Sequence, residues 1–280
     1  ITGSSGFLGA KLFVFLKKNK HTIIETTKNI NEKNKFYLRL GEDINTIHNI
    51  NILKNTQVII HCAFDFTPNT YNDHYKTNIT GSKKIFEISK KFNIKIIYIS
   101  SISAFKNAKS IYGRVKYNIE NLALDFEAIN IRPGLIYGQN AKGMFGRIEK
   151  LINFFPILPL INFGKQIIFP CKIEILVKLI NKLITLKYEK KITITAASED
   201  KIYFKDLIEI IAKKQNKKIY LIPFPSLIIY FFLNFNVYLN LFKGIKKDNL
   251  TSILNIDKNP DFTTLRKLNI EFPKFEEDYK

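Results

Sequence analysis

Apolar runs and helical patterns alternate through the first half of the chain, and this alternation constrains the fold most strongly. The apolar runs at 58–63 and 94–100 are continuous, as expected for strands that are buried on both faces. Apolar residues at 78–92 and 112–126 recur with the helical period. This order predicts a parallel sheet covered by helices on both faces, which is a doubly wound α/β fold.

The second half of the 280 residues has a different pattern of predicted elements. Helical patterns dominate there, and one short strand is expected near 192–196. We predict a nucleotide-binding domain over 1–165. A small C-terminal lobe is expected over 166–280, and it partly returns strands to the core sheet. The expected helices of this half are 146–155, 173–187, 204–214 and 225–242.

A glycine-rich turn with the spacing G-x-x-G-x-x-G opens the chain. Gly3 permits a tight reversal, Gly6 lets the backbone approach a pyrophosphate, and Gly9 lets the following helix pack on the strand. The helix N-terminus would offer free N–H groups to the phosphates of NAD or NADP. This predicts a Rossmann-type dinucleotide site, although an ordinary turn before a helix can have the same glycines. Ile1 and Thr2 are expected to end a strand whose earlier residues are missing.

A serine pair, a tyrosine and a lysine form the second motif. Ser100 and Ser101 end a buried strand, and Tyr112 and Lys116 share one face of the next helix. A phenol with an ordinary pKa of about 10 is a poor base, and a nearby ammonium is expected to lower that pKa. The set predicts acid–base catalysis of hydride transfer, with the Ser101 hydroxyl orienting the substrate. The alternative is a solvated helix face in a Lys-rich chain.

These residues together resemble the extended short-chain dehydrogenase/reductase family, in its NAD-dependent epimerase/dehydratase group. The similarity extends over nearly the whole chain, and its short motifs are specific in order and spacing. The matching segments are ITGSSGFLG at 1–9, VIIHCA at 58–63, NITGSKKIFEISKK at 78–91, IIYISSISAF at 96–105, YGRVK at 112–116, IRPGLIYG at 131–138, FPCKIEILVKLI at 169–180 and TTLRKLNIEFPKFEE at 263–277.

The resemblance implies roles for single residues. Tyr112 would be the catalytic acid/base, Lys116 would tune it and bind the nicotinamide ribose, and Ser101 would orient the substrate. Asn78 would support the active site from a helix. Ser100 and Ser103 would be structural, with Ser103 as the alternative to Ser101. The implied cofactor-binding residues are Gly3, Ser5, Gly6, Phe7, Leu8, Gly9, Lys28, Asp43, Ile44, Ala63, Tyr112, Lys116 and Pro133, with Tyr137 beside the nicotinamide.

The choice between NAD and NADP depends on the end of the second strand. Family members that prefer NAD often have an acid there for the ribose 2′-hydroxyl, whereas Thr27 aligns with that acid here and Lys28 follows. Lys28 could pair with a 2′-phosphate, which slightly favours NADP, but a register shift of two would bring in Glu25. Asp43 and Ile44 resemble the pair that contacts adenine, although Asp43 is equally well explained as a solvated loop acid.

The resemblance implies a nucleotide-sugar substrate and hydride transfer at a sugar carbon. Thr27 and Lys28 favour a 4-keto-sugar reductase, whereas the commonest activity of the group favours an epimerase. A dehydratase is disfavoured, because Ile102 and Ser103 stand where dehydratases of this resemblance have an acidic pair. A non-catalytic NAD(P)-binding scaffold ranks low, since the tyrosine and the lysine are both present.

The net charge of +20 could indicate nucleic acid, but only five of the 44 basic residues are Arg, the usual reader of base edges. We therefore expect no nucleic-acid partner. Two cysteines and no cluster with metal-ligand spacing argue against disulfides and a metal site, and they fit a cytoplasmic protein. His61 is expected in the core, whereas His21, His48 and His74 are expected at the surface.

The apolar run at 226–242 is interrupted by three asparagines and is shorter than the roughly 20 residues of a membrane span. It predicts a helix of the C-terminal lobe that is packed or lies at a homodimer interface. The alternative is a helix lying on a membrane surface. That alternative would fit a lipid, steroid or lipid-linked-sugar dehydrogenase of the same fold.

Overall fold

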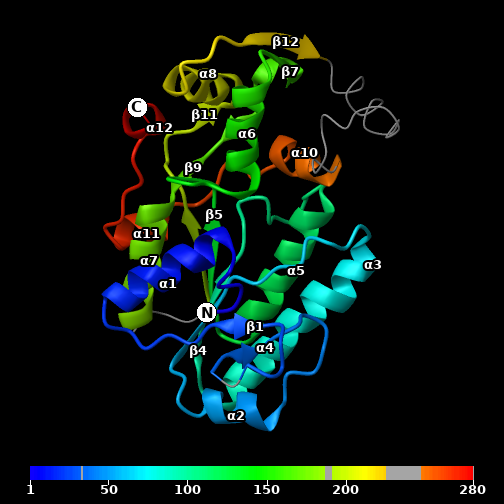
Figure 1. Cartoon of the computed structure of the whole chain (residues 1–280), viewed down its shortest axis with the longest axis vertical. Coiled ribbons are helices and arrows are strands. Elements are labelled where there is room, and N and C mark those ends of the chain that lie inside the picture. Colours follow the sequence, from blue (N-terminus) through cyan, green and yellow to red (C-terminus); the bar gives the residue numbers. More distant parts are fainter. Residues whose placement is uncertain (33, 187–190, 225–246, 280) are drawn as a thin grey trace.

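A four-stranded parallel sheet forms the centre of the molecule (Figure 1). The structure is a computed structural model that describes residues 1–280 apart from 33, 187–190, 225–246 and 280. The strands lie in the order β10 (Ile192–Ala196), β5 (Ile129–Pro133), β4 (Lys95–Ile99) and β3 (Val58–His61). Because β10 pairs with β5 along its whole length, the second half of the chain returns a strand to this sheet.

The sheet continues beyond β3 through the first residues of the chain. Thr2 forms an isolated parallel bridge with His61, and its N–H donates to Ile60 O at 3.0 Å. The strands β1 (Thr26–Thr27) and β2 (Phe36–Tyr37) form a separate parallel pair. The first residue of β1 lies beside the glycine-rich turn, because the Gly3 N–H donates to Thr26 Oγ1 at 3.2 Å.

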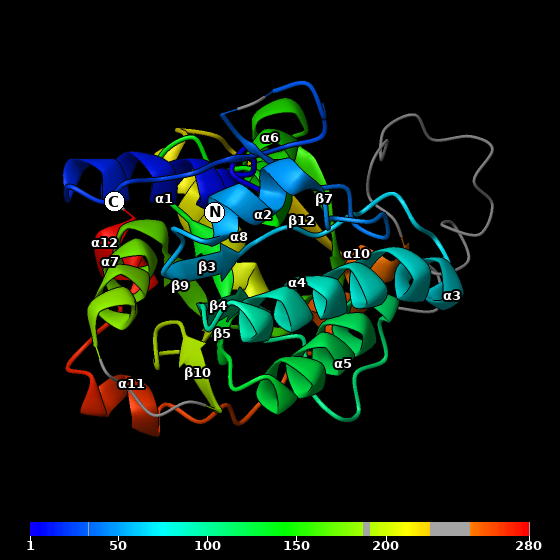
Figure 2. The same ribbon diagram turned by 90° about the horizontal axis from the view of Figure 1, so that it is seen from below.

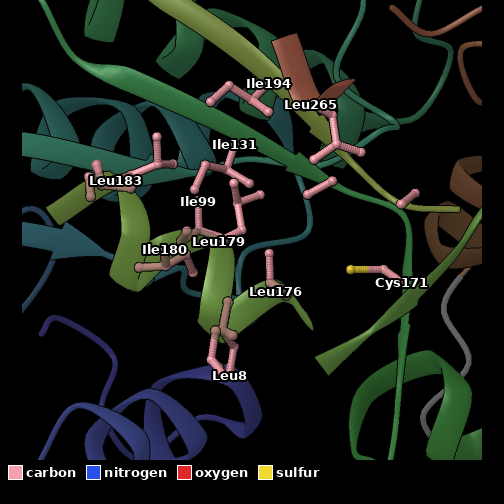
Figure 3. Packing of buried hydrophobic residues seen from close by; sticks show 14 of the residues in the cluster. Leu8, Ile99, Ile131, Cys171, Leu176, Leu179, Ile180, Leu183, Ile194 and Leu265 are labelled. Atoms are coloured by element: carbon pink, nitrogen blue, oxygen red, sulfur yellow. The ribbon is translucent and has the colours of Figure 1, made fainter. Parts of the chain in front are cut away.

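Helices cover both faces of the sheet (Figure 2). In β4, Ile97 and Ile99 belong to the core cluster of one face, and Ile96 and Tyr98 belong to that of the other. Figure 3 shows side chains of the helix at 173–185 packed between Leu8 and the strands of the first face. The helices of the first face are α1 (Phe7–Lys18), α7 (Ile173–Thr185) and α11 (Thr263–Lys267); those of the second are α2 (Ile47–Leu53), α4 (Thr80–Lys91) and α5 (Ile111–Asp125).

A third core cluster lies in a lobe that is built mainly from the second half of the chain (Figure 1). Its short sheets pair β6 with β9, β7 with β12, and β8 with β11. The remaining elements are α3 (Tyr71–His74), the π-helix η1 (Tyr75–Ile79), β6 (Leu135–Tyr137), α6 (Gly143–Phe154), β7 (Ile157–Ile161), the 3-10 turn η2 (Asn162–Gly164), β8 (Ile167–Ile168), β9 (Pro170–Lys172), β11 (Ile202–Tyr203), α8 (Phe204–Lys214), β12 (Tyr220–Phe224), α10 (Lys247–Leu254) and α12 (Phe275–Asp278).

The doubly wound α/β fold predicted from the sequence is confirmed, as is the strand at 192–196. The strands β1 and β2 have only two residues each. The small strands of the lobe were missed, because runs of two or three residues carry no readable period. The helix expected at 225–242 lies outside the described residues, and the domain boundary at 165 stays a prediction.

The burial predicted from the sequence is correct for His61 and wrong for His74. His61 is buried as expected, and its Nδ1 and Nε2 lie 2.7 Å from Thr2 Oγ1 and 3.0 Å from Ser82 Oγ. Burial lowers the pKa of His61 to about 3, so this ring is neutral at neutral pH and does not accept a proton there. The surface position expected for His74 is wrong: it is buried, with Nδ1 2.9 Å from Asn78 Nδ2.

Leu176 of α7 tests whether the second half of the chain is part of the main core. Its side chain is fully buried between α1 and the sheet (Figure 3), so Leu176→Ala is expected to lower the free energy of unfolding by about 2–5 kcal/mol in urea titrations. Val14→Ala, on the exposed side of α1, is the control and should cost less than about 0.5 kcal/mol. Equal effects of the two changes would contradict this core.

Candidate active site

The glycine-rich turn has a backbone that only glycine accommodates at two of its three positions. Gly3 has a φ of +68°, and a Cβ there would lie 2.9 Å from Ala63 N. A Cβ on Gly9 would lie 2.2 Å from Gly3 O, so the helix could not pack so closely on the turn. The predicted conformational roles of Gly3 and Gly9 therefore correspond to observed geometry, and the turn lies directly against Ala63.

The N-terminus of α1 fits an anionic group. The helix begins at Phe7 with Gly6 as its N-cap, no side chain caps it, and no acid lies in its first turn. Ser5 and Gly6 are exposed, so the outer side of this bend is open to a pyrophosphate, although the Gly6 N–H itself donates to Gly3 O at 3.0 Å. Phe7 and Leu8 direct their side chains into the core cluster, which leaves their backbone for a cofactor contact.

The segment after β4 carries the candidate substrate-orienting serine. Ser100 N donates to Ile131 O at 2.7 Å, and Ile102 N donates to Pro133 O at 2.9 Å. These bonds extend the β4–β5 pairing beyond the end of β4, so Ser101 lies half-buried beside Pro133 at the carboxyl edge of the sheet. This is the edge at which ligands bind in open α/β sheets.

The helix α5 presents Tyr112 and Lys116 to this edge. Ser110 is its N-cap, with Oγ accepting the Gly113 N–H at 3.0 Å. The buried Lys116 Nζ donates to Ile99 O at 2.8 Å and lies 6.0 Å from the centre of the Tyr112 ring. Burial lowers the pKa of Lys116 to about 8, although Cys62 and Glu120 favour the charged form.

The pKa of Tyr112 differs from the sequence-based expectation. Burial raises it to about 12, while a hydrogen bond between the Tyr112 and Ser101 side chains acts in the opposite direction. The expected lowering by the Lys116 ammonium is wrong for this arrangement, because burial of the phenol dominates and Lys116 Nζ is bonded to Ile99 O. At neutral pH the phenol is therefore protonated and can donate a proton.

Two phenylalanines that the sequence analysis missed surround Tyr112. The Phe64 ring lies 5.2 Å from the Tyr112 ring in an edge-on contact, and the Phe66 ring stacks on it at 6.0 Å. Lys116 Nζ lies 4.7 Å above the centre of the Phe64 ring. Ala63 lies against Gly3 of the glycine-rich turn, and the next residue, Phe64, contacts Tyr112 and Lys116. Two Phe directly after a buried strand were a readable signal for this role.

Asn78 holds the loop that carries these rings. It is fully buried in η1, its Oδ1 accepts the Asp65 N–H at 2.7 Å, and its Nδ2 donates to Asp65 O at 2.9 Å. Asp65 lies between Phe64 and Phe66. The expected supporting role of Asn78 therefore has a geometric basis, and single π-helical turns occur frequently at functional sites.

A buried ion pair below Lys116 is a second feature that the sequence analysis missed. Glu120, one helical turn after Lys116, is only 2% exposed. Arg132 of β5 donates to it through Nε at 2.9 Å and through Nη2 at 2.7 Å. Burial raises the pKa of Glu120 although the guanidinium lowers it, as expected for a carboxylate in a dry place.

The residues predicted at the adenine end lie apart from this cluster. A cavity of about 630 Å³ follows β1 and is lined by Thr27, Lys28, Asn29, Ile30, Tyr37 and Arg39. Glu25 is not among the lining residues. The exposed Asp43 accepts the Asn45 N–H, while Ile44 is buried in the core, so only the backbone of Ile44 remains for a cofactor contact.

Over the described residues, no group of three His, Cys, Asp or Glu side chains is arranged to hold a metal ion. The same part of the chain has no helix with the length and apolarity needed to cross a membrane. The run at 226–242, on which the membrane alternative depended, lies outside it.

Comparisons with known proteins identify relatives of this arrangement. The model of the NAD dependent epimerase/dehydratase family matches residues 1–155. UDP-glucose 4-epimerase of Vibrio cholerae is 27% identical over 184 residues, which are 55% of this chain and 56% of that protein. The match thus spans about half of the length of this curated relative.

Solved structures show the same fold at low sequence identity. UDP-glucose 4-epimerase of Thermotoga maritima with UDP-glucose has a TM-score of 0.71 at 17% identity, covering 100% of this chain and 95% of that one. For dTDP-4-dehydrorhamnose reductase of Bacillus anthracis with NADP the TM-score is 0.69 at 18% identity, covering 99% and 95%. The fold is therefore the Rossmann-type α/β fold of the extended short-chain dehydrogenases/reductases. The chain belongs to the NAD dependent epimerase/dehydratase family, whose model matches more than half of it.

The Glu120–Arg132 pair provides a test of how α5 is held on the sheet. Glu120→Ala is expected to lower the free energy of unfolding by about 3–5 kcal/mol, because it leaves a largely buried guanidinium without its partner. Glu87→Ala on α4 breaks an exposed pair with Lys83 and should cost less than about 1 kcal/mol. Denaturant titrations measure the free energy of unfolding of both variants. A similar small decrease for the two would show that the buried pair does not anchor α5.

Proposed function

We propose that this protein is an NADP-dependent oxidoreductase that reduces a keto group in the sugar of a nucleotide sugar. The observation that supports this most strongly is the grouping at the carboxyl edge of the sheet. The Ser101 and Tyr112 side chains lie near each other there, with Lys116 behind them. Phe64 and Ala63 connect this group to the glycine-rich turn.

The proposed chemistry assigns the proton to Tyr112. With a pKa of about 12 the phenol is protonated at neutral pH, and it would donate its proton to the oxygen of a sugar ketone. Ser101 would donate a hydrogen bond to the same oxygen. The reduced nicotinamide supplies the hydride when it is bound. Lys116 lies one helical turn away, with Nζ 6.0 Å from the centre of the Tyr112 ring, and it would bind the nicotinamide ribose.

The proposed preference for NADP is supported by the cavity after β1. Lys28 and Arg39 bring two positive side chains to it, and the Arg39 Nε donates to Lys28 O at 3.2 Å. Thr27 itself is uncharged, while its Oγ1 donates to the Glu32 carboxylate at 2.9 Å and Glu42 lies 3.8 Å from Arg39, so the two basic side chains act against two nearby acids. A guanidinium with an ammonium beside it is the usual partner of a phosphate monoester. The N–H groups at the start of α1 would hold the pyrophosphate.

The sugar is proposed to lie against Phe66. This ring is 64% exposed and stacks on Tyr112, so it borders the position of the reacting carbon. Aromatic rings are good partners for surfaces rich in C–H groups. A nucleotide sugar is supported by the relatives, since the Thermotoga maritima epimerase structure contains UDP-glucose.

The second candidate is an epimerase, which the match to UDP-glucose 4-epimerase of Vibrio cholerae favours. In that reaction Tyr112 would accept the hydroxyl proton while hydride leaves the same carbon for the oxidised nicotinamide. After the keto sugar has turned over, Tyr112 would return the proton to the oxygen as hydride returns to the opposite face of the carbon. An oxidised nicotinamide ring near the phenol would favour this first step by lowering the phenol pKa. Net oxidation of NADPH by a keto substrate distinguishes the reductase, since an epimerase consumes no cofactor.

Tyr112→Phe tests the proposed acid. Turnover of keto and hydroxy forms of UDP- and dTDP-sugars, followed by reduced-nicotinamide absorbance, is expected to fall by about 10²–10⁴-fold. The cofactor dissociation constant should stay within about twofold, since the ring and its contacts with Phe64 and Phe66 remain. Tyr117→Phe, one helix position after Lys116, is the matched control and should keep full activity. Undiminished turnover by Tyr112→Phe would refute the mechanism.

Arg39→Ala tests the cofactor preference. The variant is expected to raise the dissociation constant of NADPH by about tenfold, because it loses one charge-assisted hydrogen bond to the 2′-phosphate. Binding of NADH should change by less than about twofold, and Lys54→Ala at an exposed site should affect neither. Titration of reduced-cofactor fluorescence measures both constants. Equal weakening of NADPH and NADH, or no weakening, would remove the argument for NADP.

A further inference from the structure

The helix α10 lies beside the N-terminus of α5 (Figures 1 and 2), although well over a hundred residues of chain separate them. Asp248 in its first turn makes the contact. One carboxylate oxygen, Oδ1, accepts the Ile111 N–H at 2.6 Å, and Oδ2 accepts the Tyr112 N–H at 2.9 Å. Both are charge-assisted bonds of ordinary to short length.

This carboxylate completes the N-terminal cap of α5. Ser110 Oγ accepts the Gly113 N–H, so the first three N–H groups of the helix are all bonded to side chains. Groups at this end of a helix have no acceptor within the helix, and a negative charge there interacts favourably with the helix dipole. One of the three is the N–H of Tyr112, so Asp248 acts on the residue that bears the candidate acid.

The same segment also holds the loop that carries Ser101. Ser103 Oγ donates to Ser252 O at 3.3 Å and lies 3.2 Å from Ser252 Oγ. Asp257 N donates to Ile102 O at 3.4 Å. A further bond runs from Lys109 N to Asn255 Oδ1 at 2.8 Å, between the loop and α5. Residues 248–257 therefore contact the segment that joins Ser101 to Tyr112, close to both of its ends.

We propose that Asp248 is a positioning residue for catalysis, through which the second half of the chain fixes the phenol of Tyr112 relative to the Ser101 hydroxyl. The inference rests on the proposed role of Tyr112 as the acid. Asp248 touches neither the phenol nor the reacting atoms. Its bonds to the backbone keep the first turn of α5 in place, and a small displacement of an acid from its target costs a large factor in rate. The glycine-rich turn and the cavity at Lys28 do not depend on it.

The test compares Asp248→Ala and Asp248→Asn in the full chain. Asp248→Ala is expected to lower kcat by about 10–100-fold while the cofactor dissociation constant stays within about twofold. Asp248→Asn keeps one acceptor oxygen and should restore part of kcat. Hydrogen exchange of the backbone over 111–113 should become about tenfold faster in Asp248→Ala, as expected for the loss of one such bond. Glu199→Ala, which breaks the exposed pair with Arg266, is the matched control and should leave all readouts unchanged.

Any other outcome contradicts either the positioning role of Asp248 or the proposed role of Tyr112 as the acid. Wild-type kcat or unchanged exchange over 111–113 in Asp248→Ala would overturn it. A parallel loss of kcat and cofactor binding, with no recovery in Asp248→Asn, would show only a structural role and would also overturn it. Full turnover by Tyr112→Phe in the same assays would instead refute the proposed function, and the exchange rates would still report whether Asp248 caps α5.

Discussion

Two opposite charges on the buried face of α5 determine how this helix lies on the sheet. Lys116 and Glu120 are 3% and 2% exposed, and a charge so far from water must be partnered. Lys116 bonds to the last carbonyl of β4, and Glu120 bonds to Arg132 of β5. These two attachments fix the rotation of the helix, so Tyr112 is directed to the carboxyl edge of the sheet, where Ser101 lies.

Much of the fold and part of the site could be predicted, because they depend on local patterns. Continuous apolar runs specify strands that are buried on both faces, and the glycines specify a turn that few other residues tolerate. The full environment of Tyr112 could not be predicted: the two Phe after β3 carried a signal, but Asp248 comes from a distant part of the chain. For the same reason the direction of the phenol pKa was predicted wrongly: the sequence indicates the lysine but not how deeply the ring is buried.

The two halves of the chain are joined through the core and through the site. The helix α7 and the strand β10 belong to the main core, while residues 248–257 contact the segments around Ser101 and Tyr112. A lobe attached in this way can vary at its surface while Tyr112 and Ser101 keep their geometry. The solved structures of an epimerase and of a reductase share this fold, so the fold alone does not fix the reaction.

In the proposed reaction the Tyr112 phenol faces the nicotinamide of a bound cofactor. The most direct measurement is an ultraviolet difference titration of tyrosinate, wild type minus Tyr112→Phe, with and without saturating NADP⁺. The positive ring of NADP⁺ should lower the pKa of Tyr112 from its value of about 12 by at least about one unit. An unchanged pKa in protein that has bound NADP⁺ would contradict the claim.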